Sequence, residues 1–178
     1  MCSSDLGATI VHGLDTLCIM GLDTEYEEGR DLIKHNFILD GISGWLSVFE
    51  MNMHFVRSFL ILYAFTGDDI YEEKAQEVVD ELLPAFRLPT GASYSLIQVE
   101  NGSSKNYDID CDKSSILGEV GSLHFEFAYL SHITGSSLCE ENCVKKERNC
   151  PRDIERSGKI ECLSIRLVPQ KRIWSAIH

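Results

Sequence analysis

The stretch that most constrains the fold runs from Gly44 to Gly67 (GWLSVFEMNMHFVRSFLILYAFTG) and is apolar on nearly every side. It is long enough for about five helical turns, and a helix that is apolar all round lies buried in its fold. Glu50 interrupts the apolar surface near the start of the stretch. A buried carboxylate is costly unless it is partnered or used, so Glu50 is the first candidate for a functional residue. The alternative is a structural acid at a helix start, stabilised by the helix dipole.

Further helices are expected on both sides of this stretch, from apolar periodicity and from N-cap residues. The caps are Ser4 or Asp5, Asp68 or Asp69, and Ser114 or Ser115. A strand is expected over Ser95–Val99, and the predicted helices are Leu6–Met20, Tyr26–His35, Ile70–Leu83 and Ser115–Ile133. Pro84 ends the fourth helical region of the chain, because proline cannot continue a helix.

A repeat emerges from the glycines that end the apolar helices. Gly21, Gly67 and Gly135 each follow an apolar helix, and after each of them an amphipathic helix is expected to begin within about four residues. A buried helix paired with an outer helix, repeated along the chain, is typical of helical toroids and solenoids. The pattern therefore predicts an all-α fold built from helical hairpins.

The same repeat places two carboxylates at one height. Glu50 lies 17 residues before Gly67, and Glu119 lies 16 residues before Gly135. At about 1.5 Å per residue, both lie roughly 25 Å from the glycine end of their helices. The spacing predicts that the two side chains face one cavity at the same end of the fold. For Glu119, the alternative is again an ordinary acid inside a first turn.

Charge is distributed unevenly along the 178 residues, whose net charge is −12. Residues 1–140 hold 7 Lys and Arg against 23 Asp and Glu, which gives −16, whereas residues 141–178 hold 9 against 5, which gives +4. The acidic body argues against nucleic acid as a partner. The N-terminus lacks the basic start and apolar core of a signal peptide, and no apolar run approaches the roughly 20 residues of a membrane span.

The cysteines give no defensible metal pattern. The chain has seven, and the spacing of the last four, at 139, 143, 150 and 162, matches no zinc motif. Asn101-Gly102-Ser103 is a glycosylation sequon, which has meaning only in the secretory pathway.

Several motifs occur in order along residues 3–140 and carry a family resemblance. The chain resembles the class I α-1,2-mannosidases, glycoside hydrolase family 47, and within them the Golgi-type subgroup. The matching runs are Ser4–Val11, Leu14–Leu17, Ile19–Leu22, Ser47–Glu50, Leu82–Phe86, Pro89–Gly91, Gly118–Glu119 and Gly121–Phe127.

The resemblance implies an (α/α)7 barrel with a bound Ca²⁺. It implies inverting hydrolysis of terminal α-1,2-linked mannose from high-mannose N-glycans on glycoproteins, in the Golgi or the endoplasmic reticulum. Glu50 matches the general acid of the family, a role that the expected burial would suit by raising its pKa. Glu119 matches an acid that contacts sugar hydroxyls, and His54 stands at a substrate-binding position.

Some positions depart from the family pattern. His54 replaces an arginine and therefore lacks its permanently charged, bidentate fork. Arg57 and Ser58 replace two glycines, His12 replaces an aspartate, and Ser93 replaces a proline.

The resemblance covers only part of the family's catalytic domain. Residues 1–140 are expected to form a partial barrel of about three of the seven hairpins, and residues 141–178 to form an irregular, basic, cysteine-containing tail outside the family pattern. The Ca²⁺ ligand and the candidate bases belong to unmatched regions, so no metal ligand is assigned here and little activity is expected from this chain alone. The alternatives are a non-catalytic glycan-binding or quality-control protein on the same fold, and a non-functional fragment.

Overall fold

A computed structural model describes residues 7–39, 42–87, 93–107, 115–136 and 164–165. The helices are α1 (Ala8–Met20), α2 (Asp23–Asn36), α3 (Val48–Met51), the π-helical turn η2 (Asn52–Val56), α4 (Arg57–Thr66), α5 (Asp69–Leu82), the 3-10 turn η3 (Leu83–Phe86) and α6 (Leu117–Thr134). The strands are β1 (Leu46–Ser47), β2 (Leu96–Gln98), β3 (Ser103–Lys105), β4 (Ser115–Ile116) and β5 (Ser164–Ile165).

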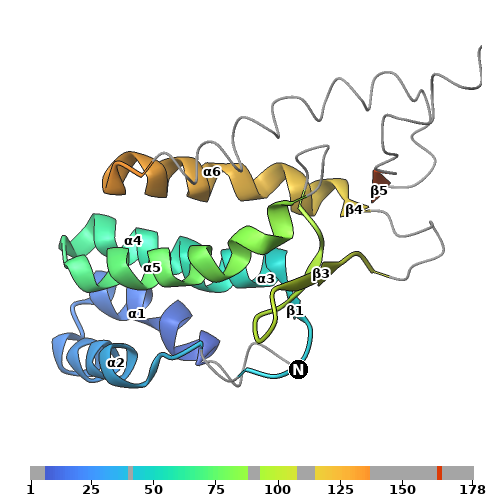
Figure 1. Cartoon of the computed structure of the whole chain (residues 1–178). Coiled ribbons are helices and arrows are strands. Elements are labelled where there is room, and N and C mark those ends of the chain that lie inside the picture. Colours follow the sequence, from blue (N-terminus) through green and yellow to red (C-terminus); the bar gives the residue numbers. More distant parts are fainter. Residues whose placement is uncertain (1–6, 40–41, 88–92, 108–114, 137–163, 166–178) are drawn as a thin grey trace, which may run out of the picture.

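The helices are arranged in three tiers: α1 with α2, then α4 with α5, and then α6 (Figure 1). The predicted glycine stops are confirmed, because Gly21, Gly67 and Gly135 all have the left-handed φ of 67° to 68° that ends a helix. Asp68 is confirmed as the N-cap of α5, since its carboxylate accepts a hydrogen bond from the backbone N–H of Ile70. The segment after Gly135 that should hold the third outer helix lies outside the described residues, as do Ser4 and Asp5.

The central helix differs from the prediction at its start. It does not begin at Gly44, which has a φ of 104°, but after the two-residue strand β1, at Val48. Ser47 caps it, and its side chain accepts a hydrogen bond from the backbone N–H of Glu50. From there α3, η2 and α4 form one helical run that widens into a π-helical turn at Asn52–Val56, where the Arg57 N–H reaches back five residues to the Asn52 carbonyl.

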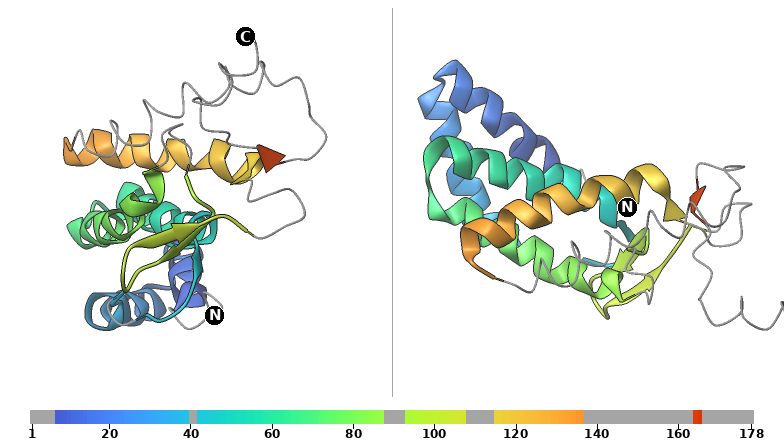
Figure 2. Two further views of the ribbon diagram at one scale, coloured as in Figure 1. Left: turned by 45° about the vertical axis from the view of Figure 1, so that its right-hand side comes forward. Right: turned by 90° about the horizontal axis from the view of Figure 1, so that it is seen from above.

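A small antiparallel sheet of order β1-β2-β3 accounts for the strand that the sequence predicts near Ser95, and adds two partners that it does not predict. Leu46 pairs with Ile97, and Ile97 pairs with Ser104. The sheet lies at the end of the molecule where α3 and α6 begin (Figures 1 and 2). It therefore holds the start of the central helix, since β1 leads directly into α3.

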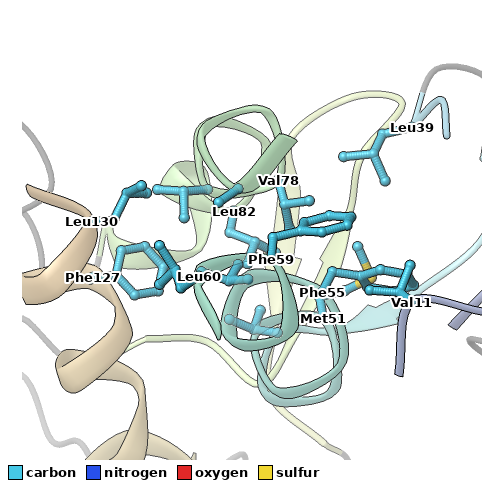
Figure 3. Close-up of a cluster of buried hydrophobic side chains, with 14 of the residues drawn as sticks. Val11, Leu39, Met51, Phe55, Phe59, Leu60, Val78, Leu82, Phe127 and Leu130 are labelled. Atoms are coloured by element: carbon cyan, nitrogen blue, oxygen red, sulfur yellow. The ribbon is translucent and has the colours of Figure 1, made fainter. Parts of the chain in front are cut away.

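The core lies between the three tiers and is mostly aromatic and branched aliphatic (Figure 3). Phe55 and Phe59 are fully buried, and both pack against Phe37, with ring centroids 5.3 Å and 5.1 Å away. Phe127 joins α6 to the same core through Phe86, at 5.2 Å. Burial of one such side chain contributes about 1.5–3 kcal/mol, so these contacts hold α6 against the hairpins.

Among the residues that the structure describes, several apolar side chains of the inner helices are exposed. The exposed apolar side chains on α1, α4 and α6 are Ile10, Ile19, Met20, Phe65, Phe125 and Tyr129. The central helix is therefore not buried all round as expected, and Glu50 and Arg57 lie on its exposed side. Helical hairpins with an uncovered inner face have the form expected of a partial α/α barrel. In the described part of the chain, no helix has both the length and the apolar character needed to cross a bilayer.

Candidate functional site

Glu50 lies in the first turn of the central helical run, where Ser47 caps the chain after β1. The pattern Ser-x-x-Glu is that of a capping box, in which the glutamate would return to the cap residue. The Ser47 half of the box forms, with its Oγ 3.2 Å from the Glu50 nitrogen. The Glu50 carboxylate instead reaches forward one turn, so that its Oε2 lies 2.6 Å from Nε2 of His54.

His54 connects Glu50 to a second helix. Its other ring nitrogen, Nδ1, forms a hydrogen bond with Nε2 of His12 on α1. The two rings meet edge to face, with centroids 4.6 Å apart and planes at 77°. Burial and the neighbouring His54 hold the pKa of His12 below its ordinary value, and Asp15 partly offsets this. The three side chains thus form a continuous chain of hydrogen bonds, Glu50–His54–His12.

The expectation that Glu50 is buried is wrong, because 53% of its side chain is exposed. The inner face of the central helix that carries it is uncovered among the described residues, and an exposed first-turn acid can be hydrated. The interpretation of Glu50 as an acid at a helix start agrees with this placement, although its hydrogen bond with His54 gives it a partner beyond the helix dipole.

Glu119 lies in the first turn of α6 and is half-buried. Its Oε2 and the nearby Ser95 Oγ are both shielded from solvent, and neither forms a hydrogen bond of ordinary geometry within the described residues. Burial is the largest cause of the raised pKa of Glu119, the Ser95 hydroxyl lowers it in part, and the charge of Glu50 raises it again. The effect of burial on an acid's pKa that was expected in this site is therefore found at Glu119.

The sheet brings the two acids together at one end of the molecule. The Ser95 carbonyl accepts a hydrogen bond of 2.9 Å from the Val48 N–H at the start of the helix that carries Glu50. The side chain of Ser95 lies beside Glu119, and Asn106 holds the Ser95 N–H through a bond of 3.1 Å. Ser95, the residue before β2, thus contacts both the start of the central helix and the acid at the start of α6.

Two neighbouring grooves run along the contact between the central helix and α6. The first has a volume of about 440 Å³ and the second about 240 Å³, and Arg57, Phe125 and Glu126 line both. Neither groove is lined by Glu50, Glu119 or His54, so a cavity shared by the two carboxylates stays a prediction. Arg57 places a cation along a surface where two glycines are expected from the resemblance.

Asn52 and Ser95 are polar residues of the site that sequence reasoning did not single out. Asn52 is fully buried in the π-helical turn and donates a hydrogen bond of 3.3 Å to Glu126 on α6. Its side-chain oxygen has no hydrogen-bond partner in the described structure. The one available signal was an amide in an otherwise apolar run, whereas nothing in the sequence marked the π-helical turn or the neighbourhood of Ser95.

Within the described ranges, no three His, Cys, Asp or Glu side chains converge in an arrangement that could hold a metal ion. These residues therefore do not fit the Ca²⁺ that the resemblance implies, and no chemical step is routed through that ion. Cys18 is a free cysteine, and the four cysteines of the tail lie outside the described residues.

Comparisons with known proteins agree with this architecture. A family described as glycosyl hydrolase family 47 matches residues 1–171. The matched range extends past residue 140, and the predicted boundary there stays a prediction. The chain is 58% identical to mannosyl-oligosaccharide α-1,2-mannosidase IA of Drosophila melanogaster over 176 residues, which is 99% of this chain and 26% of that protein. It is 40% identical to mannosyl-oligosaccharide 1,2-α-mannosidase IB of Mus musculus, covering 99% of this chain and 27% of the relative.

The fold is similar to that of the solved α-1,2-mannosidase from Trichoderma reesei. The TM-score is 0.69 at 23% identity, over 80% of this chain and 32% of that structure. The chain thus spans about a quarter of the length of the curated relatives it matches, and the fold is a partial (α/α)7 barrel. The family match over nearly the whole sequence, together with this fold, shows that the chain belongs to glycosyl hydrolase family 47.

Proposed function

We propose that this chain forms part of the catalytic domain of an α-1,2-mannosidase that removes terminal mannose from high-mannose N-glycans with inversion. Two observations support the proposal. The first is the family match. The second is the position of Glu50 and Glu119 in the first turns of two inner helices, close enough for the charge of Glu50 to raise the pKa of Glu119. Inverting hydrolysis needs one carboxyl group to protonate the leaving oxygen and a second to activate water across about 6.5–9.5 Å. We assign the first role to Glu50.

Glu119 and His54 have supporting roles in this proposal. The raised pKa of Glu119 keeps its carboxyl protonated to a higher pH than that of a solvated glutamate, and a protonated carboxyl donates a hydrogen bond to a sugar hydroxyl. His54 holds the Glu50 carboxyl through the 2.6 Å contact, and we assign it a substrate-binding role beside that acid. The base that activates water and the ligands of Ca²⁺, the cofactor expected for the intact domain, are assigned to parts of a complete domain outside the described residues.

We propose the secretory pathway, Golgi or endoplasmic reticulum, as the compartment, because the relatives are named as mannosidases of oligosaccharides. Asn101 provides a direct check. It is exposed at the tip of the β2–β3 hairpin, where its side chain accepts a hydrogen bond from the Ser103 N–H. A chain that passes through this pathway should carry an N-glycan there, visible as a mobility shift that Asn101→Gln and glycan-removing enzyme both abolish.

The decisive test places residues 1–178 in the matching segment of the Drosophila melanogaster relative, which supplies the remainder of the domain. We expect the chimera to release mannose from a high-mannose glycan, and Glu50→Gln to reduce its kcat by about 10²–10⁴-fold, the usual contribution of a general acid. Asp23→Asn, at an exposed first-turn acid of α2, is the matched control and should keep full activity. An active Glu50→Gln chimera would refute the assignment.

The isolated chain is expected to release no measurable mannose, because an acid without a base cannot complete the reaction. A second candidate function, a non-catalytic glycan-binding protein, is favoured by one observation: the Glu50 carboxylate and both ring nitrogens of His54 are already engaged. Saturable binding of glycan by a chimera that hydrolyses nothing would support it. Aggregation of the purified chain through its uncovered apolar face would instead point to a fragment without function of its own.

A further inference from the structure

The chain of hydrogen bonds from Glu50 to His12 carries an inference about how Glu50 exchanges its proton, and this inference rests on the proposed function. His54 is the central member. Its Nε2 lies 2.6 Å from Glu50 Oε2, and its Nδ1 bonds to Nε2 of His12. Both ring nitrogens of His54 are thus committed, one to the acid on its own helical run and one to a different helix.

A neutral imidazole has one donor and one acceptor nitrogen, so the two hydrogen bonds of His54 must run in the same direction. When Glu50 is ionised, His54 donates from Nε2 and accepts at Nδ1 from the Nε2–H of His12. When Glu50 is protonated, its O–H donates to Nε2 of His54, whose Nδ1–H donates to His12. A change of charge at Glu50 therefore changes the tautomer of both histidines.

We propose that His54 and His12 are positioning residues that form a proton relay, returning a proton to Glu50 after each protonation of a leaving group. In the balanced step, His12 begins as an imidazolium. Its Nε2–H bond breaks as a proton binds Nδ1 of His54, while the Nε2–H bond of His54 breaks as a proton binds Glu50. Glu50 and both histidines become neutral, and each histidine now carries its proton on Nδ1. After Glu50 gives up its proton, the hydrogen bonds open and hydronium from solvent protonates Nε2 of His12. His54 returns to its Nε2–H tautomer by releasing its Nδ1 proton to solvent and taking one up at Nε2.

The surrounding charges allow the relay to return to its starting state. The charged and titratable groups nearby are Asp15 on α1, Glu50 on the central helix and, beyond Glu50, Glu119 on α6. Burial and His54 disfavour a charge on His12, whereas Asp15 favours it. Burial and His54 therefore make the His12 cation less favourable than that of a solvated histidine, which suits a group that passes its proton on.

The test is a pH titration of the full 178-residue chain by NMR, in which the ¹⁵N shifts of the imidazoles report tautomer and charge. It uses no glycan, so its outcome is independent of whether the chain takes part in hydrolysis. We expect Glu50→Ala to shift the titration midpoint of His12 by about half a pH unit or more, as coupled sites require, although His12 does not touch Glu50. His54 should lose its Nε2–H tautomer in the same variant.

His35 and His132, exposed at the ends of α2 and α6, are internal controls whose midpoints should not move. Glu50→Gln serves as a second variant that keeps the shape of the side chain. If His12 titrates identically in the wild type and in both variants while the controls show an intact fold, the relay is refuted. If His12 responds but the chimera above is inactive, the proton coupling of Glu50, His54 and His12 stands, whereas its role in hydrolysis fails together with the hydrolase proposal.

Discussion

Glu50 and Glu119 occupy the same position in two inner helices, the first turn after a short strand, yet their surroundings are opposite. Glu50 is 53% exposed and takes its partner, His54, from the next turn of its own helical run. Glu119 is half-buried, its Oε2 has no hydrogen-bond partner in the described structure, and its neighbours Ser95 and Glu50 come from other elements. Local sequence thus decides the environment of the first acid, and tertiary packing decides that of the second.

The difference shows how one fold gives two carboxyls different properties. A carboxyl shielded from water and near a like charge holds its proton more tightly, whereas an exposed carboxyl with an imidazole partner remains hydrated and exchangeable. Pairs of acids whose environments differ in this way are suited to different chemical roles. Substitutions at and around Glu50 and Glu119 test this difference in their surroundings.

The largest change in stability is expected when the packing of α6 against the core is weakened. Phe127→Ala removes the buried ring that packs on Phe86 at 5.2 Å and should cost about 3–5 kcal/mol of unfolding free energy. The pKa of Glu119 should then fall toward its ordinary value, whereas the Glu50–His54 hydrogen bond should persist, because both of its members lie on the central helix. Denaturant unfolding and NMR titration measure the two effects.

The matched control is Phe125→Ala on the same helix, where the ring is 68% exposed and the expected change is within about 0.5 kcal/mol. Phe127→Leu is a milder variant in case the alanine variant does not fold. An unchanged titration of Glu119 in folded Phe127→Leu and Phe127→Ala chains would contradict the claim that α6 packing sets its pKa.

Asp68 extends the comparison to an acid that has a strong partner. Its Oδ2 lies 2.6 Å from Nε of Arg30, each side chain is 26% exposed, and Arg30 is the largest cause of its lowered pKa. Asp68→Asn keeps an N-cap for α5 but loses the ion pair, at a cost of about 1–2 kcal/mol.

The pH dependence of this cost has a definite sign. Since the folded pKa of Asp68 lies below the unfolded value of 3.8, the stabilisation is complete above 3.8 and is lost as the pH falls through the folded pKa. The difference between wild type and Asp68→Asn should shrink accordingly in acid unfolding curves. Asp69→Asn, the exposed neighbouring acid, is the control, and an equal loss there would show that only the helix dipole matters.

Neutralising each of the two compared acids should change stability in opposite directions at neutral pH. Glu119→Gln should raise the unfolding free energy, by under about 1 kcal/mol, because it removes a partly buried charge. Glu50→Gln should lower it slightly, because the charge-assisted hydrogen bond with His54 is weakened. Thermal or denaturant unfolding at pH 7 measures both.

For Glu119 the sign follows from a folded pKa above the unfolded value of 4.5. The favourable contribution of the native carboxyl is present below 4.5 and is lost as the pH rises through the folded pKa. The advantage of Glu119→Gln should therefore vanish below about pH 4.5. An advantage that persists unchanged in acid would show that the gain has another cause.

The smallest effect concerns His12. Its lowered pKa means that the unfolded chain binds its proton more readily, so stability falls as the pH decreases from 6.5 through the folded pKa. His12→Asn should remove this acid loss, which we expect to be a few tenths of a kcal/mol for an exposed side chain. His35→Asn on α2 should leave the curve unchanged, and an identical response from both variants would contradict the prediction.

Much of the helical framework was predictable from local signals. Gly21, Gly67 and Gly135 mark helix ends because only a residue without Cβ adopts the left-handed conformation at low cost. Asp68 marks a helix start through its own side chain. The start of the central helix was not predictable in this way, because Leu46 and Ser47 become a strand only through pairing with β2, a partner 50 residues away at Leu96–Ile97.

The candidate site was likewise predictable only in part. Its motifs, with Glu50 and Glu119 as their acids, were evident in the sequence, and the structure places both in first turns at one end of the fold. The burial of Glu50 was predicted from an apolar surface on all sides of its helix and is wrong, because the face that carries Glu50 is uncovered in the described structure. Nor did the sequence indicate that His12, on another helix, would meet His54.

The sequence by itself determined where the helices stop and which carboxylates begin the inner helices, because these depend on interactions within a few residues. It also carried the family motifs, which are evident as runs of residues in order along the chain. The tertiary structure decided which acid is shielded from solvent and that His12 joins His54 beside Glu50. These properties depend on solvent exclusion and on contacts between α1, β2, the central helix and α6, and such contacts exist only after distant segments have packed together.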